Sequence, residues 1–315
     1  MNQIKKEITI IISVYNEEKN IGPLIHKIME YVEELHKFNI KLFFIDDGSV
    51  DNTLENIKNY TKLHDNIKYI SFTRNFGHEV AMMAGIQTIK DSDAYIFMDG
   101  DFQHPPEIIP KMINAWDKGS PLVLTRRIEE NIHTTPYKIF SRVFYKVLNS
   151  LSDFEIKKDS PDFRLLNKKY ASELRKFNEM SPVVRFMLNS FMKETDVTEI
   201  PFKLKDRKFG ESKYSYWKLF GLAIDSMVSF SVKPLRIALI GSVAIFFLSM
   251  LVGVFFFLKW VFMGNPTPGF MTLLLTNISL GAANLFVLSV IGEYIAKIHI
   301  EVKKRPMYII SEMNL

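Results

Sequence analysis

The chain has 315 residues, of which 47% are hydrophobic and 24% are charged, and its formal net charge is +5 at pH 7. This length is enough for one α/β catalytic domain with a large core and an additional membrane part. The absence of cysteine excludes disulfides and Cys-bound zinc. The modest positive charge is concentrated near two apolar segments, which favours anionic lipids and phosphates as partners and argues against nucleic acid. Residues 1–7 are polar and charged, which is not typical of a signal peptide.

Before Lys233, apolar runs of strand length alternate with helical patterns. The expected elements, in chain order, are a strand at 8–14, a helix at 17–38, a strand at 41–46, a helix at 51–63, a strand at 67–72, a helix at 77–89, a strand at 94–98, a helix at 106–117 and a strand at 120–125. This alternation predicts a mostly parallel sheet that is covered by helices on both faces. Open α/β sheets of this kind bind ligands at the carboxyl ends of their strands.

Polar residues follow the first two predicted strands. The first strand runs into residues 15–17, Tyr-Asn-Glu, and the second runs into Asp46 and Asp47. Turn chemistry and helix capping account for Asp51 and Thr53, which are good N-caps for the next helix. Capping does not explain two adjacent carboxylates, because such groups repel each other. They are more easily explained as acceptors for the hydroxyls or the base of a nucleotide.

A basic residue follows the third strand, and two carboxylates follow the fourth. Arg74 suits a phosphate, whereas Asp99 and Asp101 offer the hard oxygen ligands that Mg²⁺ and Mn²⁺ prefer. An Asp-x-Asp pair is also common in acidic turns, so a metal site is favoured only by the polar groups that follow the neighbouring strands. For His78, packing or a helix start is the expected role.

These segments together resemble family 2 glycosyltransferases of the GT-A fold. The likeness rests on Ser-Val-Tyr-Asn-Glu-Glu at 13–18, Asp-Asp-Gly-Ser-x-Asp-x-Thr at 46–53, Arg-Asn-Phe-Gly-His at 74–78 and Asp-Gly-Asp-Phe-Gln-His-Pro-Pro-Glu at 99–107. Within the family, the chain is most similar to the polyprenyl-phosphate glycosyltransferases, the group of bactoprenol glucosyltransferase and dolichol-phosphate mannose synthase. The likeness extends to the two apolar segments and to a Lys-Lys-Arg-Pro-x-Tyr motif at 303–308. It departs at Gly100, where Ala is expected more often, and this change is not expected to disturb the metal.

The resemblance implies the transfer of a sugar from a nucleotide-sugar to a polyprenyl phosphate, with inversion at the anomeric carbon. A divalent metal, Mg²⁺ or Mn²⁺, would neutralise the leaving diphosphate. The acceptor phosphate has a second pKa of about 6, so it is already largely dianionic at neutral pH and needs no strong base. The implied nucleotide-sugar ligands are Ser13, Tyr15, Asn16, Glu17, Asp47, Arg74, Asp99, Gly100 and Asp101, and the implied metal ligands are Asp99, Asp101 and Gln103.

The resemblance also implies a set of catalytic and acceptor-binding residues. The implied catalytic residues are Asp101, Asp162, Arg126 and Arg142, and Arg127 is an alternative to Arg126. The residues expected to bind the acceptor phosphate are Arg126, Arg142, Arg164 and Lys213. Arg142 belongs to a basic stripe on a predicted helix at 137–148, which suits a membrane surface and equally an ordinary solvated face. Lys213 lies in a Gly-x-Ser-Lys-Tyr element at 210–214, which suits a phosphate-closing flap, although a basic linker would look the same.

Two uncharged apolar stretches, 237–258 and 270–291, are long enough to cross a bilayer. Basic residues flank them on the sides of both termini, so the positive-inside rule predicts a multi-pass protein of the cell membrane with both termini and the catalytic domain in the cytoplasm. Asn277 and Asn284 in the second stretch suit helix–helix contact and so a homo-oligomer. The expected division is a catalytic domain at 1–212, an amphipathic juxtamembrane segment at 213–232, two membrane helices within 233–298 and a basic cytoplasmic tail at 299–315.

Other functions share parts of this pattern. A processive polysaccharide synthase would carry a Gln-x-x-Arg-Trp element, but Trp116, Trp217 and Trp260 all lack a preceding Arg. A nucleotidyltransferase would carry a Gly-rich phosphate loop near the N-terminus, and no such loop is visible there. A catalytically silent membrane adaptor that binds sugar nucleotides stays open, although Asp99 and Asp101 argue against it. UDP-glucose is the first choice of donor, and UDP-N-acetylglucosamine and GDP-mannose are the alternatives.

Overall fold

The computed structural model describes residues 5–128, 161–203, 231–263 and 269–315. The chain divides into two compact units. The first comprises Met1–Lys138, Lys157–Lys213 and Arg305–Leu315, and the second comprises Ile139–Ile156 and Tyr214–Lys304.

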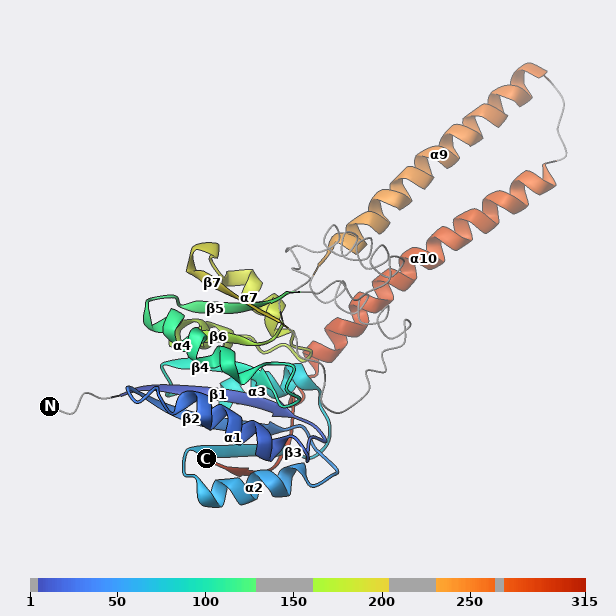
Figure 1. The fold of residues 1–315 in the computed structure, drawn as a ribbon. Helices are drawn as coiled ribbons and strands as arrows, with labels where there is room; N and C mark the ends of the chain where they lie inside the picture. Colours follow the sequence, from blue (N-terminus) through green and yellow to red (C-terminus); the bar gives the residue numbers. More distant parts are fainter. Residues whose placement is uncertain (1–4, 129–160, 204–230, 264–268) are drawn as a thin grey trace. The chain divides into compact units, whose positions relative to one another are not determined.

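The first unit is built on an eight-stranded sheet in the described part of the chain, with the order β7-β5-β6-β4-β1-β2-β3-β8 (Figure 1). The strands are β1 (Lys6–Val14), β2 (Phe38–Asp46), β3 (Ile67–Phe72), β4 (Ala94–Asp99), β5 (Leu122–Ile128), β6 (Arg164–Asn167), β7 (Val197–Lys203) and β8 (Ile310–Asn314). β6 and β8 are antiparallel to their neighbours, and the other pairs are parallel. The predicted mostly parallel sheet is therefore confirmed.

Helices cover both faces of this sheet. One face packs against α1 (Ile21–Val32), α2 (Thr53–Leu63), the short η1 (Pro106–Ile108) and α4 (Ile109–Asp117), and the other packs against α3 (His78–Thr88), α6 (Lys168–Leu174) and α7 (Val184–Phe191). A further short turn, η2 (Glu194–Asp196), precedes β7. Helix α1 shows why these segments fold as they do: its buried residues recur at helical spacing, so the helix presents one apolar stripe to the strands. They are Ile21, Leu24, Ile25 and Ile28.

The sequence prediction and the structure differ at several places in this unit. The first helix was expected at 17–38 but spans Ile21–Val32, because backbone turns precede and follow it. The second strand therefore begins at Phe38 and not at 41, and the fifth spans Leu122–Ile128 and not 120–125. The residues after position 299 were expected to form a basic tail, whereas Ile310–Asn314 form the edge strand β8 beside β3. β6, β7, α6 and α7 lie beyond the last predicted strand and were not anticipated.

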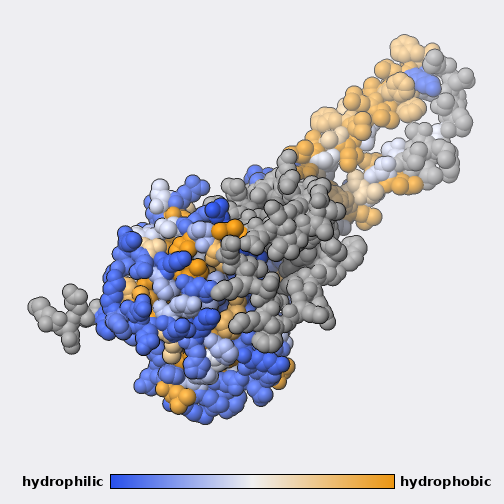
Figure 2. Space-filling view, in the orientation of Figure 1, coloured by the Kyte–Doolittle hydropathy of each residue, from blue (hydrophilic) through white to orange (hydrophobic). Residues whose placement is uncertain are grey.

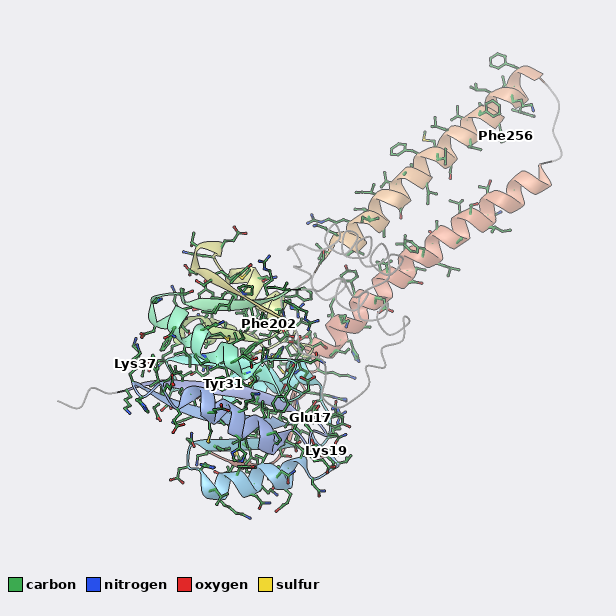
Figure 3. All side chains as sticks on the ribbon, in the orientation of Figure 1. Glu17, Lys19, Tyr31, Lys37, Phe202 and Phe256 are labelled. Atoms are coloured by element: carbon green, nitrogen blue, oxygen red, sulfur yellow. The ribbon has the colours of Figure 1, made fainter. Side chains whose placement is uncertain are left out.

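The second unit contains two long helices, α9 (Lys233–Met263) and α10 (Phe270–Val302). Apolar side chains gather over α9, and Phe256 is among them (Figures 2 and 3). Within the described residues, Leu235–Phe262 and Thr276–Val302 are long and apolar enough to cross a membrane. Both helices are longer than the predicted uncharged stretches, because each continues through charged residues. α9 includes Lys233 and Lys259, and α10 continues past Glu293 to Val302. These helices indicate membrane association.

Candidate active site

The parallel strands bring the expected site residues to one edge of the sheet. Ser13 on β1 is in register with Asp99 on β4, and Val14 is in register with Asp46 on β2. β4 and β5 are both antiparallel to β6 and therefore run in the same direction, so Arg126 near the end of β5 also lies toward this edge. β6 runs the other way, and its first residue, Arg164, pairs with Phe97 on β4 and thereby places the preceding Asp162 at the same edge.

The loop after β1 is joined by hydrogen bonds to the loop after β2. The N–H of Asn16 donates to Ser49 Oγ at 2.9 Å, and Asn16 Oδ1 accepts from the N–H of Val50 at 2.9 Å. The N–H of Glu17 donates to Thr53 Oγ1 at 2.8 Å. Asn16 has a φ of 55°, a left-handed conformation that is uncommon outside glycine and is often found at functional sites. Figure 3 shows Glu17 near the start of α1, at the carboxyl end of the sheet.

Asp47 is buried and holds the loop that carries Arg74. Its Oδ1 accepts from the N–H of Phe76 at 2.6 Å, and its Oδ2 accepts from the N–H of Gly77 at 2.9 Å. Burial raises the pKa of Asp47, and these two hydrogen bonds oppose the rise. Gly48 lies directly against the backbone of Arg74: its φ is +70°, and a Cβ there would lie 2.3 Å from the carbonyl carbon of Arg74. Direct contact between Asp47 and a nucleotide stays a prediction.

Asp46 is buried too, and it serves the same pair of loops. Its Oδ2 accepts from Ser71 Oγ at 2.7 Å, and its Oδ1 accepts from the N–H of Ser49 at 3.1 Å. Both adjacent carboxylates thus have structural hydrogen-bond partners. Their hydrogen bonds order the loop that carries Arg74, and the guanidinium of Arg74 lies 4.4 Å from the centre of the Phe76 ring.

Asp99 lies in a cluster with two histidines. Its Oδ1 is 3.3 Å from Ser13 Oγ and 3.2 Å from His78 Nδ1. Although burial opposes it, the charges of Asp99, Asp162 and Glu79 together raise the pKa of His78. His104 Nδ1 accepts from the N–H of Asp99 at 2.9 Å, so its proton lies on Nε2, and burial lowers the pKa of this histidine.

Asp101 lies in a tight turn that begins at Gly100. Its Oδ1 accepts from the N–H of Gln103 at 3.0 Å, and Phe102 between them has a φ of 65°. A Cβ on Gly100 would come within 2.5 Å of Val14 Cγ1. Glycine is therefore needed here because the strand beside it carries Val14.

The donor set fits a divalent metal that is completed by substrate. In the part of the chain that the structure describes, no group of three His, Cys, Asp or Glu side chains could hold a metal by itself. Mg²⁺ is usually held by one or two carboxylates together with substrate phosphates. Asp99 and Asp101 supply two such carboxylates in one turn, and Gln103 lies in the same turn.

Two arginines beside Asp162 favour the ionised form of its carboxyl group. It accepts a hydrogen bond from Arg164 Nη2, and its Oδ2 lies 3.4 Å from Arg185 Nη2 and 3.9 Å from His78 Nε2. Burial alone would raise the pKa of Asp162, but Arg164, Arg185 and His78 hold it below its ordinary value. His78 therefore connects the Asp99 turn to Asp162, a role that sequence reasoning missed.

Arg164 is placed differently from its predicted role. It is only 1% exposed, and its Nη2 also donates to the carbonyl oxygen of Pro161 at 3.1 Å. A guanidinium so buried orients Asp162, and its predicted contact with the acceptor phosphate would require that it become accessible. Glu79 and Arg185 were missed as well. Glu79 accepts from the N–H of Val184 at 2.9 Å, and burial, with the charge of Asp162, raises its pKa to about 7.

The remaining predicted residues lie farther along the edge or outside the described residues. Arg126 is exposed, with Nε 3.8 Å from Glu199 Oε2, and Tyr15 is 44% exposed and open to a ligand. Arg142 and Lys213 fall in segments 129–160 and 204–230, which lie outside the described residues. Their roles stay predictions.

Residues 9–175 match the family model described as Glycosyl transferase family 2. The chain belongs to this family. One relative is the SfII prophage-derived bactoprenol glucosyl transferase of Shigella flexneri, which is 34% identical over 309 residues that cover 98% of each chain. Another is a putative glycosyltransferase of Bacillus subtilis, 34% identical over 309 residues that cover 98% of this chain and 92% of the relative. The family 2 protein is thus a glycosyltransferase.

Solved structures show the same GT-A fold. A glucosyl-3-phosphoglycerate synthase from Mycobacterium tuberculosis, in complex with phosphoglyceric acid, matches with a TM-score of 0.52 and 15% identity, over 71% of this chain and 79% of that chain. The same synthase in complex with Mn²⁺, UDP-glucose and phosphoglyceric acid matches with a TM-score of 0.50 and 14% identity, over 71% of this chain and 78% of that chain. At these identities the likeness concerns the fold.

Proposed function

We propose that this family 2 glycosyltransferase transfers glucose from UDP-glucose to a polyprenyl phosphate, namely undecaprenyl phosphate. The transfer inverts the configuration at the anomeric carbon. The observation that carries the proposal is the convergence of the Asp99–Asp101 turn and the ionised Asp162 at one edge of the sheet, with His78 between them. The names of the bactoprenol glucosyl transferase relatives support the acceptor and the sugar. The Mn²⁺ and UDP-glucose complex of the structural neighbour supports the donor.

The donor half of the site lies over β1, β2, β3 and β4. Asp99 and Asp101, with Gln103, would hold Mg²⁺ or Mn²⁺, and the bound ion would supply positive charge beside the leaving diphosphate. Arg74 adds a cation beside the ring of Phe76, on a loop whose backbone is hydrogen-bonded to Asp47. Ser13, Tyr15, Asn16, Glu17 and Gly100 complete the donor-binding surface.

The acceptor half needs positioned cations more than a base. An oxygen of the dianionic acceptor phosphate attacks the anomeric carbon, the bond from that carbon to the diphosphate oxygen breaks, and UDP leaves. Arg126, Arg142 and Lys213 hold the acceptor phosphate. Asp162, kept ionised by Arg164 and Arg185, accepts hydrogen bonds from sugar hydroxyls and orients the attack.

The membrane helices bring the enzyme to its lipid substrate. In our proposal α9 and α10 both cross the cell membrane, and basic residues beside them keep the catalytic unit and both termini in the cytoplasm, where nucleotide-sugars are available. The division into a catalytic domain at 1–212, to which Arg305–Leu315 also belong, a juxtamembrane segment at 213–232 and membrane helices within 233–298 is part of this proposal. Asn277 and Asn284 on α10 suit a homo-oligomer.

A panel of radiolabelled donors tests the proposal. Purified enzyme in detergent is mixed with undecaprenyl phosphate and labelled UDP-glucose, UDP-N-acetylglucosamine or GDP-mannose, and the label that extracts with lipid is counted. We expect lipid-bound label from UDP-glucose and release of one UDP for each sugar transferred. If lipid-bound label came only from one of the other two donors, that donor would replace UDP-glucose in the proposal. If the protein bound donors but transferred no sugar, it would be an adaptor and not an enzyme.

A further inference from the structure

The residues after the second membrane helix belong to the catalytic unit, and the proposed transfer leaves them without a role. Arg305–Leu315 form part of the first unit, and β8 pairs with β3 in antiparallel register (Figure 1). The contact continues beyond the strands, because the N–H of Thr73 donates to the carbonyl oxygen of Ile309 at 3.0 Å. The Lys-Lys-Arg-Pro-x-Tyr motif ends at Tyr308, just before this strand.

A continuous series of ring contacts leads from Tyr308 to Arg74. The ring of Tyr308 stacks on Phe72 at a centroid distance of 5.0 Å and an interplanar angle of 24°. Phe72 meets Phe76 edge to face at 5.7 Å and 89°. The guanidinium of Arg74 lies 4.4 Å from the centre of the Phe76 ring. Each contact is of a favourable geometry, and together they fix the loop after β3.

A second series, of hydrogen bonds, runs beside the first. Ser311 Oγ donates to the carbonyl oxygen of Ser71 at 3.0 Å, and Ser71 Oγ donates to Asp46 Oδ2 at 2.7 Å. Asp46 in turn accepts from the N–H of Ser49 in the loop after β2. An ion pair at 2.5 Å joins Lys58 on α2 to Glu312 on β8. The C-terminal segment thus contacts both β3 and, through Ser71, the end of β2.

We propose that Tyr308 is a positioning residue for the donor site, which holds Arg74 in place through Phe72 and Phe76. This inference rests on the proposed function, in which Arg74 binds the donor diphosphate. A long, exposed arginine loses rotamer freedom when it binds, and stacking on a fixed ring reduces that loss. Without Tyr308, the buried ring of Phe72 would face water on one side, and the loop that carries Arg74 would lose its support. Only residues 303–307 separate α10 from Tyr308, so the membrane anchor connects directly to the segment that orders the donor loop.

Kinetics of Tyr308→Ala and Tyr308→Phe test the proposal in the full chain. For Tyr308→Ala we expect the KM for UDP-glucose to rise by about ten- to a hundredfold, with the KM for undecaprenyl phosphate unchanged. Tyr308→Phe keeps the ring and should restore the donor KM. Met313→Ala is the matched control, because Met313 lies on β8 but is 59% exposed and outside both series. An unchanged donor KM in Tyr308→Ala, equal changes in both KM values, or a Tyr308→Phe variant as impaired as Tyr308→Ala would overturn the proposal.

Amide hydrogen exchange gives a readout that does not depend on transfer. The N–H groups of Phe76 and Gly77 are bound to Asp47, so we expect their exchange to accelerate in Tyr308→Ala while that of Ile11 in β1 stays constant. Unaltered exchange at Phe76 and Gly77 would reject the positioning role even if the enzyme used another donor. If Tyr308→Ala fails to fold, Tyr308→Leu keeps an apolar side chain without the aromatic stack, and the same exchange and KM criteria apply to it.

Discussion

Arg185 and Asp162 form an ion pair, with Nη2 3.4 Å from Oδ2, although they are 23 positions apart in the chain. This contact, together with that of Arg164, holds the pKa of Asp162 below its ordinary value against the effect of burial. Arg185 therefore keeps a carboxylate ionised at the edge of the sheet where the donor and acceptor are proposed to meet.

Replacing Arg185 by Gln should shift the acid limb of the pH–rate profile to higher pH. Loss of the cation destabilises the carboxylate, so the pKa of Asp162 rises, and activity that needs the ionised form disappears earlier as the pH falls. The measurement is kcat/KM as a function of pH, and Arg185→Lys should recover part of the shift. Lys176→Gln, which breaks a surface pair with Glu173, is the control and should leave the profile unchanged. An acid limb that stays in place in Arg185→Gln would contradict the role of the pair.

The Asp99–Asp101 turn should be essential for transfer and dispensable for folding. We expect Asp101→Ala to abolish transfer and Asp99→Ala to impair it severely, since charge stabilisation at a leaving group is worth about 3 kcal/mol or more. Chelation by EDTA should stop the wild-type enzyme, and added Mg²⁺ or Mn²⁺ should restore it. Asp117→Ala is the control, because Asp117 lies at the end of α4 and pairs with Lys6 and Lys37. Near-wild-type turnover by Asp101→Ala, or indifference to EDTA, would remove the metal from the mechanism.

Gly100→Ala should lower the stability of the protein despite the small size of the change. The new Cβ would lie 2.5 Å from Val14 Cγ1, and overpacking of this kind costs about 1–3 kcal/mol. The measurement is the free energy of unfolding of the catalytic unit within the full chain. In a double-mutant cycle, Val14→Ala should relieve the clash, so the double variant should be more stable than the sum of the single effects. Additive effects would show that the loop moves aside freely.

The membrane topology can be tested because the chain has no cysteine. Single cysteines at Asn2 and Asn265 are treated with an impermeant thiol reagent on intact cells. We expect labelling at Asn265, in the connection between the two membrane helices, and no labelling at Asn2 until the cells are opened. The reverse pattern would overturn the proposed orientation.

The basic stripe at 137–148 yields a prediction about the acceptor. Arg142→Ala should lower kcat/KM for undecaprenyl phosphate by about ten- to a hundredfold, since a charge-assisted contact is worth about 1.5–3 kcal/mol. Lys in place of Arg142 should recover only part of this, because an ammonium does not reproduce a bidentate fork. Lys138→Ala and Lys146→Ala are the controls and should have weaker effects that fade with added salt. Equal, small and salt-sensitive losses at all three positions would mean that the stripe only faces the membrane.

The alternation of strands and helices, the mostly parallel sheet and the sheet edge that Asp99, Asp101 and Arg74 share could be predicted from the amino-acid sequence. These features follow from local information: an apolar run of strand length, an acidic or basic turn after it, and a helical pattern next. The two candidate membrane-spanning helices could be predicted in the same way, because their length and apolar composition are local properties of the sequence.

The contact partners of the polar residues became known only from the three-dimensional structure. Asp46 accepts a hydrogen bond from Ser71 on β3, 25 positions away, and Asp47 accepts from the backbone of the loop 29–30 positions away. Ser311 contacts Ser71 across 240 positions. Arg185 and Tyr308 carry no local signal for their contacts, since a residue's partner in space depends on which strands become neighbours. The sheet order makes β8 the neighbour of β3, and from that order alone the end of the chain comes to lie beside the donor loop.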